Sequence, residues 1–234
     1  MAFDFKKEYK EFYMPKRKPE IVNVPKANYI AVRGVGDPNE EGGEYKAAIG
    51  LLYTIAFTLK MSHRAGHEIE GFFDYVVPPL EGFWWQPGGH GMDYNCKYDF
   101  HWISVIRLPD FIKKEDFDWA REEATRKKKM DFSKVEFLSI EEGLCVQIMH
   151  IGSYDEEVAS IALMDAYLEQ EGYENDLSDI ELEETSQVMV PWEEKWCKMD
   201  LSGMRFHHEI YLSDARKVEP ARRKTVIRHP IKAQ

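Results

Sequence analysis

Hydrophobic positions along the chain recur with two periods, and each period predicts a kind of element. Runs rich in β-branched and aromatic residues, bounded by Gly, Pro or acidic turns, predict strands over 28–34, 72–77, 80–85, 97–108, 207–212 and 224–228. Two more strand-like runs lie within 137–151, around a predicted hairpin turn at 141–143. Apolar residues three and four apart predict helices that begin near Glu44 and cover 110–129 and 156–170. In the last helix we expect Val158, Ile161, Ala162 and Leu168 to face the core and Gly172 to end it.

The order of these elements repeats in the two halves of the chain. Residues 32–36 lead into an acidic turn and a helix, as 150–152 do, and 106–109 closes the first half as 227–230 closes the second. We therefore expect one domain over 28–230, made of a first repeat (about 28–130) and a second (about 131–230). Each repeat is a strand–helix–strand–strand unit, and two units related by a pseudo-twofold axis leave a cleft at their junction. Residues 1–27 lack a sustained period, so we expect an N-terminal arm.

Composition narrows the classes of function. The 234 residues include 42 Asp and Glu against 31 Lys and Arg, a formal net charge of −11. Such a chain repels phosphate backbones, so we expect neither nucleic acid nor a membrane as a partner. Three scattered cysteines and an N-terminus without a signal-peptide pattern favour a cytoplasmic protein. Aromatic residues reach 13%, six of them Trp. They indicate either a well-packed core or an aromatic pocket for a flat ligand.

One strand carries the best candidate for chemistry. Strand alternation puts His207, Glu209 and Tyr211 on one face, and the residues between them on the other. If the second set faces the helix, Glu209 and Tyr211 face the cleft. Aromatic walls would then raise the pKa of Glu209, making it an acid or base near neutral pH or a partner for a cationic ligand. The alternative is a glutamate on an edge strand in water. Tyr154 is a second hydroxyl that could bond the ligand or the carboxylate.

The first half supplies the rest of the expected binding wall. Glu81 is the expected counterpart of Glu209 in the other repeat, and Phe83 and Trp85 share its face of the strand. Phe100 and Trp102 share a face of the next strand and would extend the wall. We expect no cofactor and no metal, because HExxH and a dinucleotide glycine fingerprint are both absent.

Four segments resemble the stand-alone GyrI-like small-molecule-binding family over about 28–230. The segments are 79–85, 99–111, 141–154 and 207–214. The resemblance implies an α+β fold of duplicated SHS2-type units, as in the effector domains of multidrug-binding regulators. It also implies a cleft that takes small hydrophobic, cationic or polycyclic compounds. One stand-alone subfamily is implied to hydrolyse cyclopropane-bearing DNA alkylators through an aromatic cage. On this chain Glu209, with Tyr154, would orient and deprotonate the attacking water.

Two departures from the family pattern stand out. An acidic insert, 174–206, is longer than we expect and would cap the cleft or contact a protein partner, and Ser153 replaces a usual proline. Three functions stay open: a cofactor-independent hydrolase, a drug-sequestering protein, and an interaction protein similar to a gyrase inhibitor. A porphyrin-binding role is disfavoured, because no histidine is tied to a pocket face by sequence.

Overall fold

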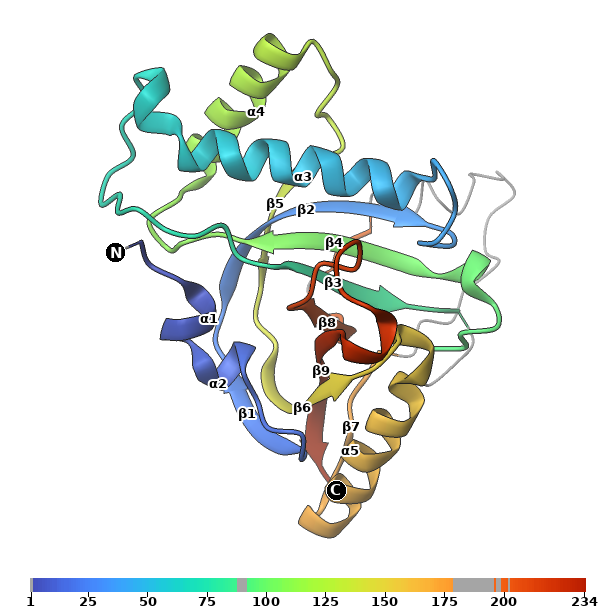
Figure 1. Ribbon diagram of the computed structural model, residues 1–234. Coiled ribbons are helices and arrows are strands. Elements are labelled where there is room, and N and C mark those ends of the chain that lie inside the picture. The colour runs from blue at the N-terminus through green and yellow to red at the C-terminus, as the bar shows by residue number, and fades with distance from the viewer. Residues whose placement is uncertain (1, 88–91, 179–195, 197–198, 202) are drawn as a thin grey trace.

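An antiparallel sheet with helices on one face organises the chain. The computed structural model describes residues 2–87, 92–178, 196, 199–201 and 203–234. The strands are β1 (Glu20–Val24), β2 (Ala27–Val35), β3 (Leu80–Trp85), β4 (His101–Arg107), β5 (Glu136–Ile140), β6 (Gly143–Ile151), β7 (Tyr173–Asn175), β8 (His207–Tyr211) and β9 (Lys224–Ala233). The helices are α1 (Phe5–Glu8), α2 (Lys10–Tyr13), α3 (Glu44–Lys60), α4 (Lys114–Lys128) and α5 (Glu157–Glu171). The strand order is β1-β6-β9-β8-β3-β4-β2-β5, and β7 pairs with β9 (Figure 1).

The expected duplication is visible in this order. The first repeat is β2-α3-β3-β4 and the second is β6-α5-β8-β9, and β3 pairs with β8 at the junction. Reading outward from that junction, each half places the second strand of its repeat, then the third and then the first. The α+β class and the pseudo-twofold arrangement predicted from the sequence are therefore confirmed.

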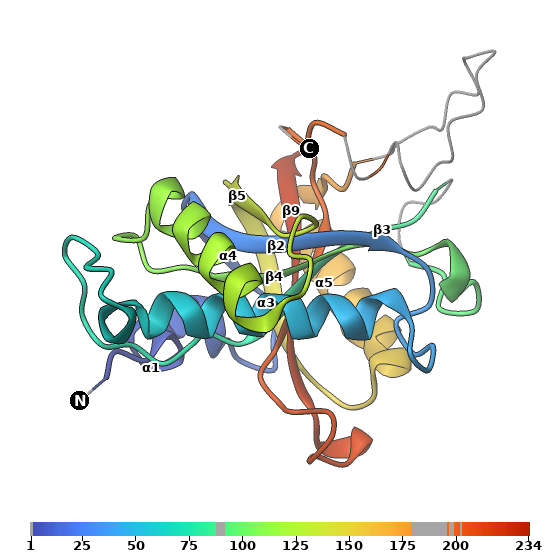
Figure 2. The same ribbon diagram turned by 90° about the horizontal axis from the view of Figure 1, so that it is seen from above.

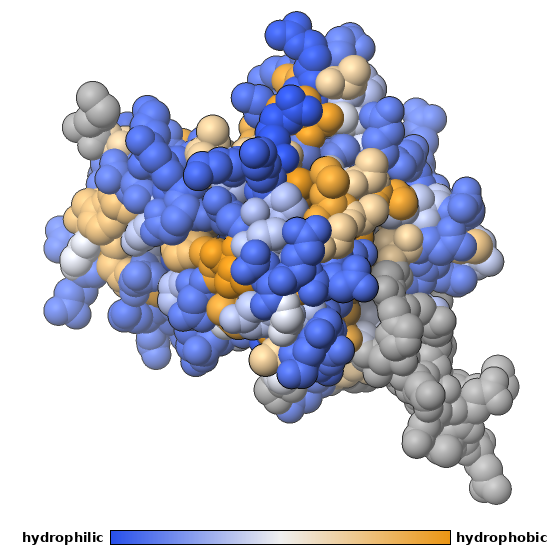
Figure 3. Space-filling model, turned by 90° about the horizontal axis from the view of Figure 1, so that it is seen from below, coloured by the Kyte–Doolittle hydropathy of each residue, from blue (hydrophilic) through white to orange (hydrophobic). Residues whose placement is uncertain are grey.

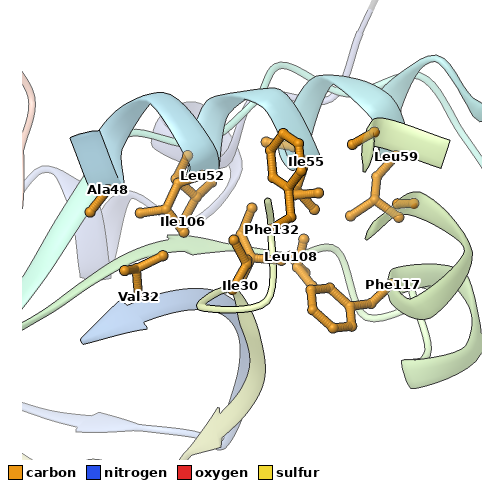
Figure 4. Close-up of a cluster of buried hydrophobic side chains, with 14 of the residues drawn as sticks. Ile30, Val32, Ala48, Leu52, Ile55, Leu59, Ile106, Leu108, Phe117 and Phe132 are labelled. Atoms are coloured by element: carbon orange, nitrogen blue, oxygen red, sulfur yellow. The ribbon is translucent and has the colours of Figure 1, made fainter. Parts of the chain in front are cut away.

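Helix α3 anchors the core of the first half. Leu52, Ile55 and Leu59 lie on one side of α3 and are fully buried against Ile106 of β4 and its neighbours (Figure 4). At roughly 25 cal/mol per Å², each such side chain contributes about 2 kcal/mol by its burial. Helix α4 packs along α3, and Figure 2 shows the two helices side by side on the same face of the sheet.

The sheet is strongly curved, as its connections show. Only two residues separate β1 from β2, and two separate β5 from β6, yet each pair lies at opposite ends of the strand order. Two residues span less than about 11 Å, so the ends of the sheet must approach each other. The predicted hairpin at 141–143 is therefore wrong: β5 pairs with β2, and β6 pairs with β1 and β9. The run 72–77 forms only an isolated bridge between Phe3 and Tyr75.

Residues 2–27, predicted to form an N-terminal arm, pack against the sheet as two short helices and a strand. Helices α1 and α2 bury Phe5, Phe12 and Tyr13 against β6, β8 and β9. Strand β1 pairs with β6 from Glu20 to Val24. The two helices and the strand are each too short to show a periodic pattern of apolar residues, so only the packed sheet reveals their role.

Helix α5 differs from its predicted orientation. Met164 and Leu168 are buried with Glu157, whereas Val158 is 57% exposed. Gly172 follows the helix with a positive φ of 76°, as predicted for its end. Exposed apolar side chains, Leu163 among them, also occur on the outer side of α5, and Figure 3 shows apolar patches on this lower side of the molecule. Within the described residues, no helix combines the length and apolarity needed to cross a bilayer.

Candidate functional site

The pairing of β3 with β8 decides which side chains meet. Gly82 lies opposite Glu209 and Trp84 opposite His207, so these four share one face of the sheet. This is the helix face, because α3 packs on it over β2 and β4 and α5 over β6. Glu209 therefore lies on β8, one of the two central strands, in the seam between the helices of the two repeats. The predicted grouping of His207, Glu209 and Tyr211 on one face is confirmed, but the assumption that the residues between them face the helix is wrong.

A buried cluster of acids and imidazoles occupies this seam. His207 Nε2 lies 3.0 Å from Glu209 Oε1 and 4.0 Å from Glu157 Oε2. On its other side, His207 Nδ1 lies 2.7 Å from Nε2 of His229 on β9. All four side chains are buried, Glu209 being only 6% exposed. The expectation of a glutamate in water on an edge strand is thereby excluded.

Glu157 enters the cluster from the first turn of α5. Ser153 caps the preceding turn: its hydroxyl and amide both bond Glu156 Oε2, at 2.9 and 3.0 Å. The buried stripe of α5 then places Glu157 over the sheet with 0% exposure. Its Oε2 accepts a hydrogen bond of 3.1 Å from the Tyr94 hydroxyl, while Oε1 has no hydrogen-bond partner among the described residues. Burial, followed by the charge of Glu209, raises the pKa of Glu157 well above its usual value.

Aromatic side chains surround the two carboxyl groups. The Trp84 indole N–H donates to the Tyr211 hydroxyl at 2.9 Å, and Tyr45 of α3 lies over Trp84 with ring centres 5.4 Å apart. Tyr154 meets Tyr211 edge-on at 5.7 Å. A Cβ at Gly82 would approach Trp84 Nε1 to 2.6 Å, so only glycine leaves the indole its place beside Glu209. We call Tyr45, Tyr94, Tyr154 and Tyr211, all half-buried, the tyrosine rim.

Three residues that were predicted to line the binding wall beside Glu209 lie on the opposite face of the sheet. Glu81, Phe83 and Trp85 alternate with Gly82 and Trp84, so they project from the opposite, inner face of the sheet. The predicted pairing of Glu81 with Glu209 across one cleft is therefore wrong. The error lies in the register between the repeats, which strand alternation alone does not determine. Phe100 and Trp102 share one face as predicted, but this is the helix face, and both are buried in the core beneath Tyr45 and Trp84 instead of lining an open wall.

The inner face carries a second buried polar network. His208 Nε2 lies 3.0 Å from Glu81 Oε2, and its Nδ1 lies 2.9 Å from Glu142 Oε2. Arg228 donates to Glu142 Oε1 at 2.9 Å, and the Tyr13 hydroxyl donates to Glu81 Oε1 at 3.0 Å. The charge of Glu142 raises the pKa of His208 against the opposing effect of burial. His208 and Arg228 in turn lower the pKa of Glu142 to about 2 despite its burial. Every group here has a partner of opposite charge.

Three residues of the insert, Trp196, Met199 and Phe206, pack against this inner face. Trp196 is fully buried and stacks on Trp85 at 5.7 Å, and Phe206 contacts Phe83. Arg33 donates to the Met199 carbonyl at 2.7 Å, which fixes this stretch to β2. Residues 179–195, 197–198 and 202, and with them Trp192, lie outside the described residues. A role of the insert as a cap over Glu209 gains no support from the residues described.

Both carboxyls of the seam are buried, Glu157 at 0% and Glu209 at 6% exposure. One hollow of about 10 Å³ lies between Phe83 and Glu142 on the inner face, and one of about 400 Å³ lies between β6 and α5. Neither is lined by Glu209 or Glu157. Because aromatic side chains of the tyrosine rim surround the buried carboxyls, a ligand reaches them only when these side chains turn aside.

The sequence could have revealed part of what was missed. Met164 and Leu168 repeat at helical spacing, and extending that stripe backwards reaches Ile161 and then Glu157. An acid in a core stripe is a signal for function. By contrast, His229, Tyr45 and Tyr94 reach the cluster only through tertiary packing, and no local pattern marks them.

The cluster permits proton transfer and could also accommodate a cation. Ligand atoms of Glu157, His207 and Glu209 all lie within 4.8 Å of one another, close enough to surround a divalent metal. In the geometry observed, however, His207 and Glu209 bond each other through the atoms that would face a metal. Two carboxyl groups in a dry aromatic setting are an arrangement suited to acid–base chemistry.

Comparisons with known proteins identify the family and the fold of this chain. The sequence model of the GyrI-like small molecule binding domain matches residues 17–187. A crystal structure of a hydrolase from Listeria innocua is 41% identical, with a TM-score of 0.80, covering 99% of this chain and 100% of that one. A conserved protein from the same organism is 43% identical, with a TM-score of 0.82 and the same coverage. The EcmrR C-terminal domain, at 13% identity and a TM-score of 0.51, covers 93% of this chain and 98% of its own, and shares the fold alone. A search among proteins of curated function found no match.

Proposed function

Since the chain belongs to the GyrI-like small-molecule-binding domain family, we propose that it binds small hydrophobic or polycyclic xenobiotics in the seam between α3 and α5 and hydrolyses strained electrophiles among them. The substrate class is compounds with a cyclopropane ring conjugated to a carbonyl group. The observation that carries the proposal is the pair of buried carboxyls, Glu209 and Glu157, enclosed by aromatic side chains. The 41% identical relative described as a hydrolase supports it.

Binding uses the aromatic side chains of the rim. A flat ring system that displaces Tyr154 from Tyr211 would stack on the rings that remain, Trp84 and Tyr45. Aromatic stacking of this kind contributes about 1 kcal/mol per pair beyond the buried area. The carboxylate of Glu209 adds an attraction for cationic ligands. The ligand therefore lies with its reactive ring over β8.

Hydrolysis then requires a base for the attacking water and an acceptor for the electron pair of the C–C bond that breaks. Glu209 accepts a proton from a water molecule, and the water oxygen forms a bond to the unsubstituted ring carbon. The strained C–C bond breaks, and its electron pair moves through the conjugated system to the carbonyl oxygen, which takes a proton to become a phenol. Burial raises the pKa of Tyr154 to about 12, so its hydroxyl keeps its proton and can orient the water.

The test is a hydration assay in isotopically labelled water. The protein is incubated in H₂¹⁸O with a polycyclic spirocyclopropyl cyclohexadienone, and the product is analysed by mass spectrometry. We expect many turnovers to an ¹⁸O-labelled alcohol. Glu209→Gln should lower the rate by about 10²- to 10⁴-fold while the protein still binds the intact cyclohexadienone.

Glu81→Gln is the matched control, because it changes a buried carboxyl of the same central strands on the inner face. It should leave turnover by the folded protein within about twofold. Stoichiometric binding without product would contradict hydrolysis and favour sequestration. Equal loss in both variants would contradict the assignment of Glu209.

A further inference from the structure

A chain of hydrogen bonds leads from the surface of α5 to Glu209. The Asn175 amide nitrogen donates to Asp165 Oδ1, and Asn175 Oδ1 lies 3.3 Å from His229 Nδ1. His229 Nε2 lies 2.7 Å from His207 Nδ1, and His207 Nε2 lies 3.0 Å from Glu209 Oε1. Asp165 is exposed, Asn175 is half-buried, and the two histidines are buried. The chain crosses α5, β7, β9 and β8.

The chemistry of Asp165 fixes the direction of every bond in this chain. A carboxylate only accepts, so the Asn175 amide must turn its NH₂ to Asp165 and its oxygen to His229. Nδ1 of His229 therefore carries a hydrogen and donates. In a neutral ring Nε2 is then bare and accepts from His207, so Nδ1 of His207 also carries its hydrogen.

The burial of His229 agrees with this direction of the hydrogen bonds. His229 lies in a dry environment beside a second imidazole, and both conditions lower its pKa well below the usual value. It is therefore the neutral acceptor that the bonding pattern requires. Asn175 cannot pass a proton onward, so the chain holds the rings in place and does not conduct protons to solvent.

This bonding pattern determines how His207 and Glu209 share a proton. With Nδ1 of His207 committed to His229, its Nε2 faces a carboxyl oxygen at hydrogen-bond distance. Two bare lone pairs would repel, so one proton must lie between Nε2 and Oε1, and Glu209 can act as the base only while that proton is on His207. That proton fixes the Glu209 carboxyl in one orientation and directs its second oxygen away from His207.

We propose that Asp165, Asn175 and His229 form a positioning chain that fixes the tautomer of His207 and thereby orients Glu209 as the base. This inference rests on the proposed function for its catalytic part, but its tautomer part does not. The chain acts on the orientation of Glu209 and touches no substrate itself. His207 is the positioning residue in direct contact with the base.

The first test is the tautomeric state of the rings. Long-range ¹H–¹⁵N NMR of the whole chain, labelled in its histidines, reports which ring nitrogens carry hydrogen. We expect His229 protonated at Nδ1 and bare at Nε2, and His207 protonated at Nδ1. Hydrogen on Nε2 of His229 would overturn the proposal whether or not the protein hydrolyses anything.

The second test changes the chain at a distance from Glu209. Asn175→Leu removes the acceptor for His229 and should shift the NMR signals that report the tautomers. It should also lower kcat about tenfold, while the affinity for the planar cationic dye rhodamine 6G is retained. Asn175→Asp restores an acceptor oxygen at the same place and should recover both. Asp165→Ala frees the amide to turn and should have a smaller effect in the same direction.

The readouts separate the two proposals. Wild-type protein without turnover but with the expected ring signals would overturn the proposed function and leave the positioning chain intact. Turnover unchanged in Asn175→Leu, despite altered ring signals, would overturn the catalytic role of the chain. Loss of kcat in Asn175→Asp as large as in Asn175→Leu would do the same.

Discussion

The two faces of the central strands carry buried carboxyls in opposite electrostatic settings. On the inner face, Glu81 and Glu142 flank His208, and Arg228 adds a second positive charge, so every carboxyl has its counter-ion. On the helix face, Glu209 and Glu157 share one imidazole of His207, and an oxygen of Glu157 has no partner. A satisfied network stabilises a fold, whereas a buried acid whose pKa is raised, as that of Glu157 is by burial and the charge of Glu209, is typical of functional sites. The contrast favours a structural role for the inner face and supports the proposal of chemistry on the helix face.

The largest expected effect is on the inner face. Arg228→Met leaves Glu142 buried beside a single imidazole, and we expect the free energy of unfolding to fall by about 3–5 kcal/mol. Chemical denaturation monitored by Trp fluorescence measures this loss. Turnover per folded molecule should be unchanged.

The Glu142→Gln/Arg228→Met double variant tests the same pair. It removes both charges at once, so it should be more stable than Arg228→Met alone. A double variant as unstable as the sum of the two single changes would show that the ion pair does not stabilise the fold.

The stability of the protein should depend on pH through Glu157 on the helix face. Glu157 holds its proton more tightly in the folded chain than in the unfolded chain, so folding loses stability as pH rises above about 4.5. In Glu157→Gln this loss is absent. We expect the free energy of unfolding of the variant to match that of the wild type near pH 4 and to exceed it at pH 8. Urea denaturation across this range measures the difference, and a variant less stable than the wild type at pH 8 would contradict the account.

Adjacent tryptophans give a matched pair for binding. Trp84 faces the tyrosine rim and Trp85 faces Trp196, so Trp84→Phe should weaken binding of the planar cationic dye rhodamine 6G about three- to tenfold. Trp85→Phe should leave the dye affinity unchanged while reducing stability. Fluorescence anisotropy measures both affinities. Equal weakening in the two variants would place the ligand away from the rim.

The smallest expected effect is that of metal removal. Because His207 and Glu209 already bond each other, dialysis against EDTA should change turnover by less than about twofold. Elemental analysis of the purified protein provides the control. Loss of turnover on dialysis, with recovery on adding Zn²⁺, would instead make Glu157, His207 and Glu209 a metal site.

The sequence predicted the repeat architecture because its signals are local. Apolar periodicity located α3 and α5, and strand alternation put His207, Glu209 and Tyr211 on one face, as observed. These properties depend on residues a few positions apart. The four segments that resemble the family then supplied the topology.

The partners of Glu209 were less predictable, for a physical reason. A shift of one residue in the pairing of β3 with β8 exchanges Trp84 for Trp85 and Gly82 for Glu81 on its face. The alternating pattern of β3 fits both choices, since its residues from Glu81 to Trp85 are all buried. Only the packed sheet distinguishes the reactive face from the structural one.

The most direct test of the account is a crystal structure of Glu209→Gln soaked with the spirocyclopropyl cyclohexadienone. We expect the intact compound in the seam between α3 and α5, with its ring system against Trp84 and its cyclopropane next to residue 209. A compound seated on the inner face beside Phe83, or in the hollow between β6 and α5, would contradict the assignment of chemistry to the helix face.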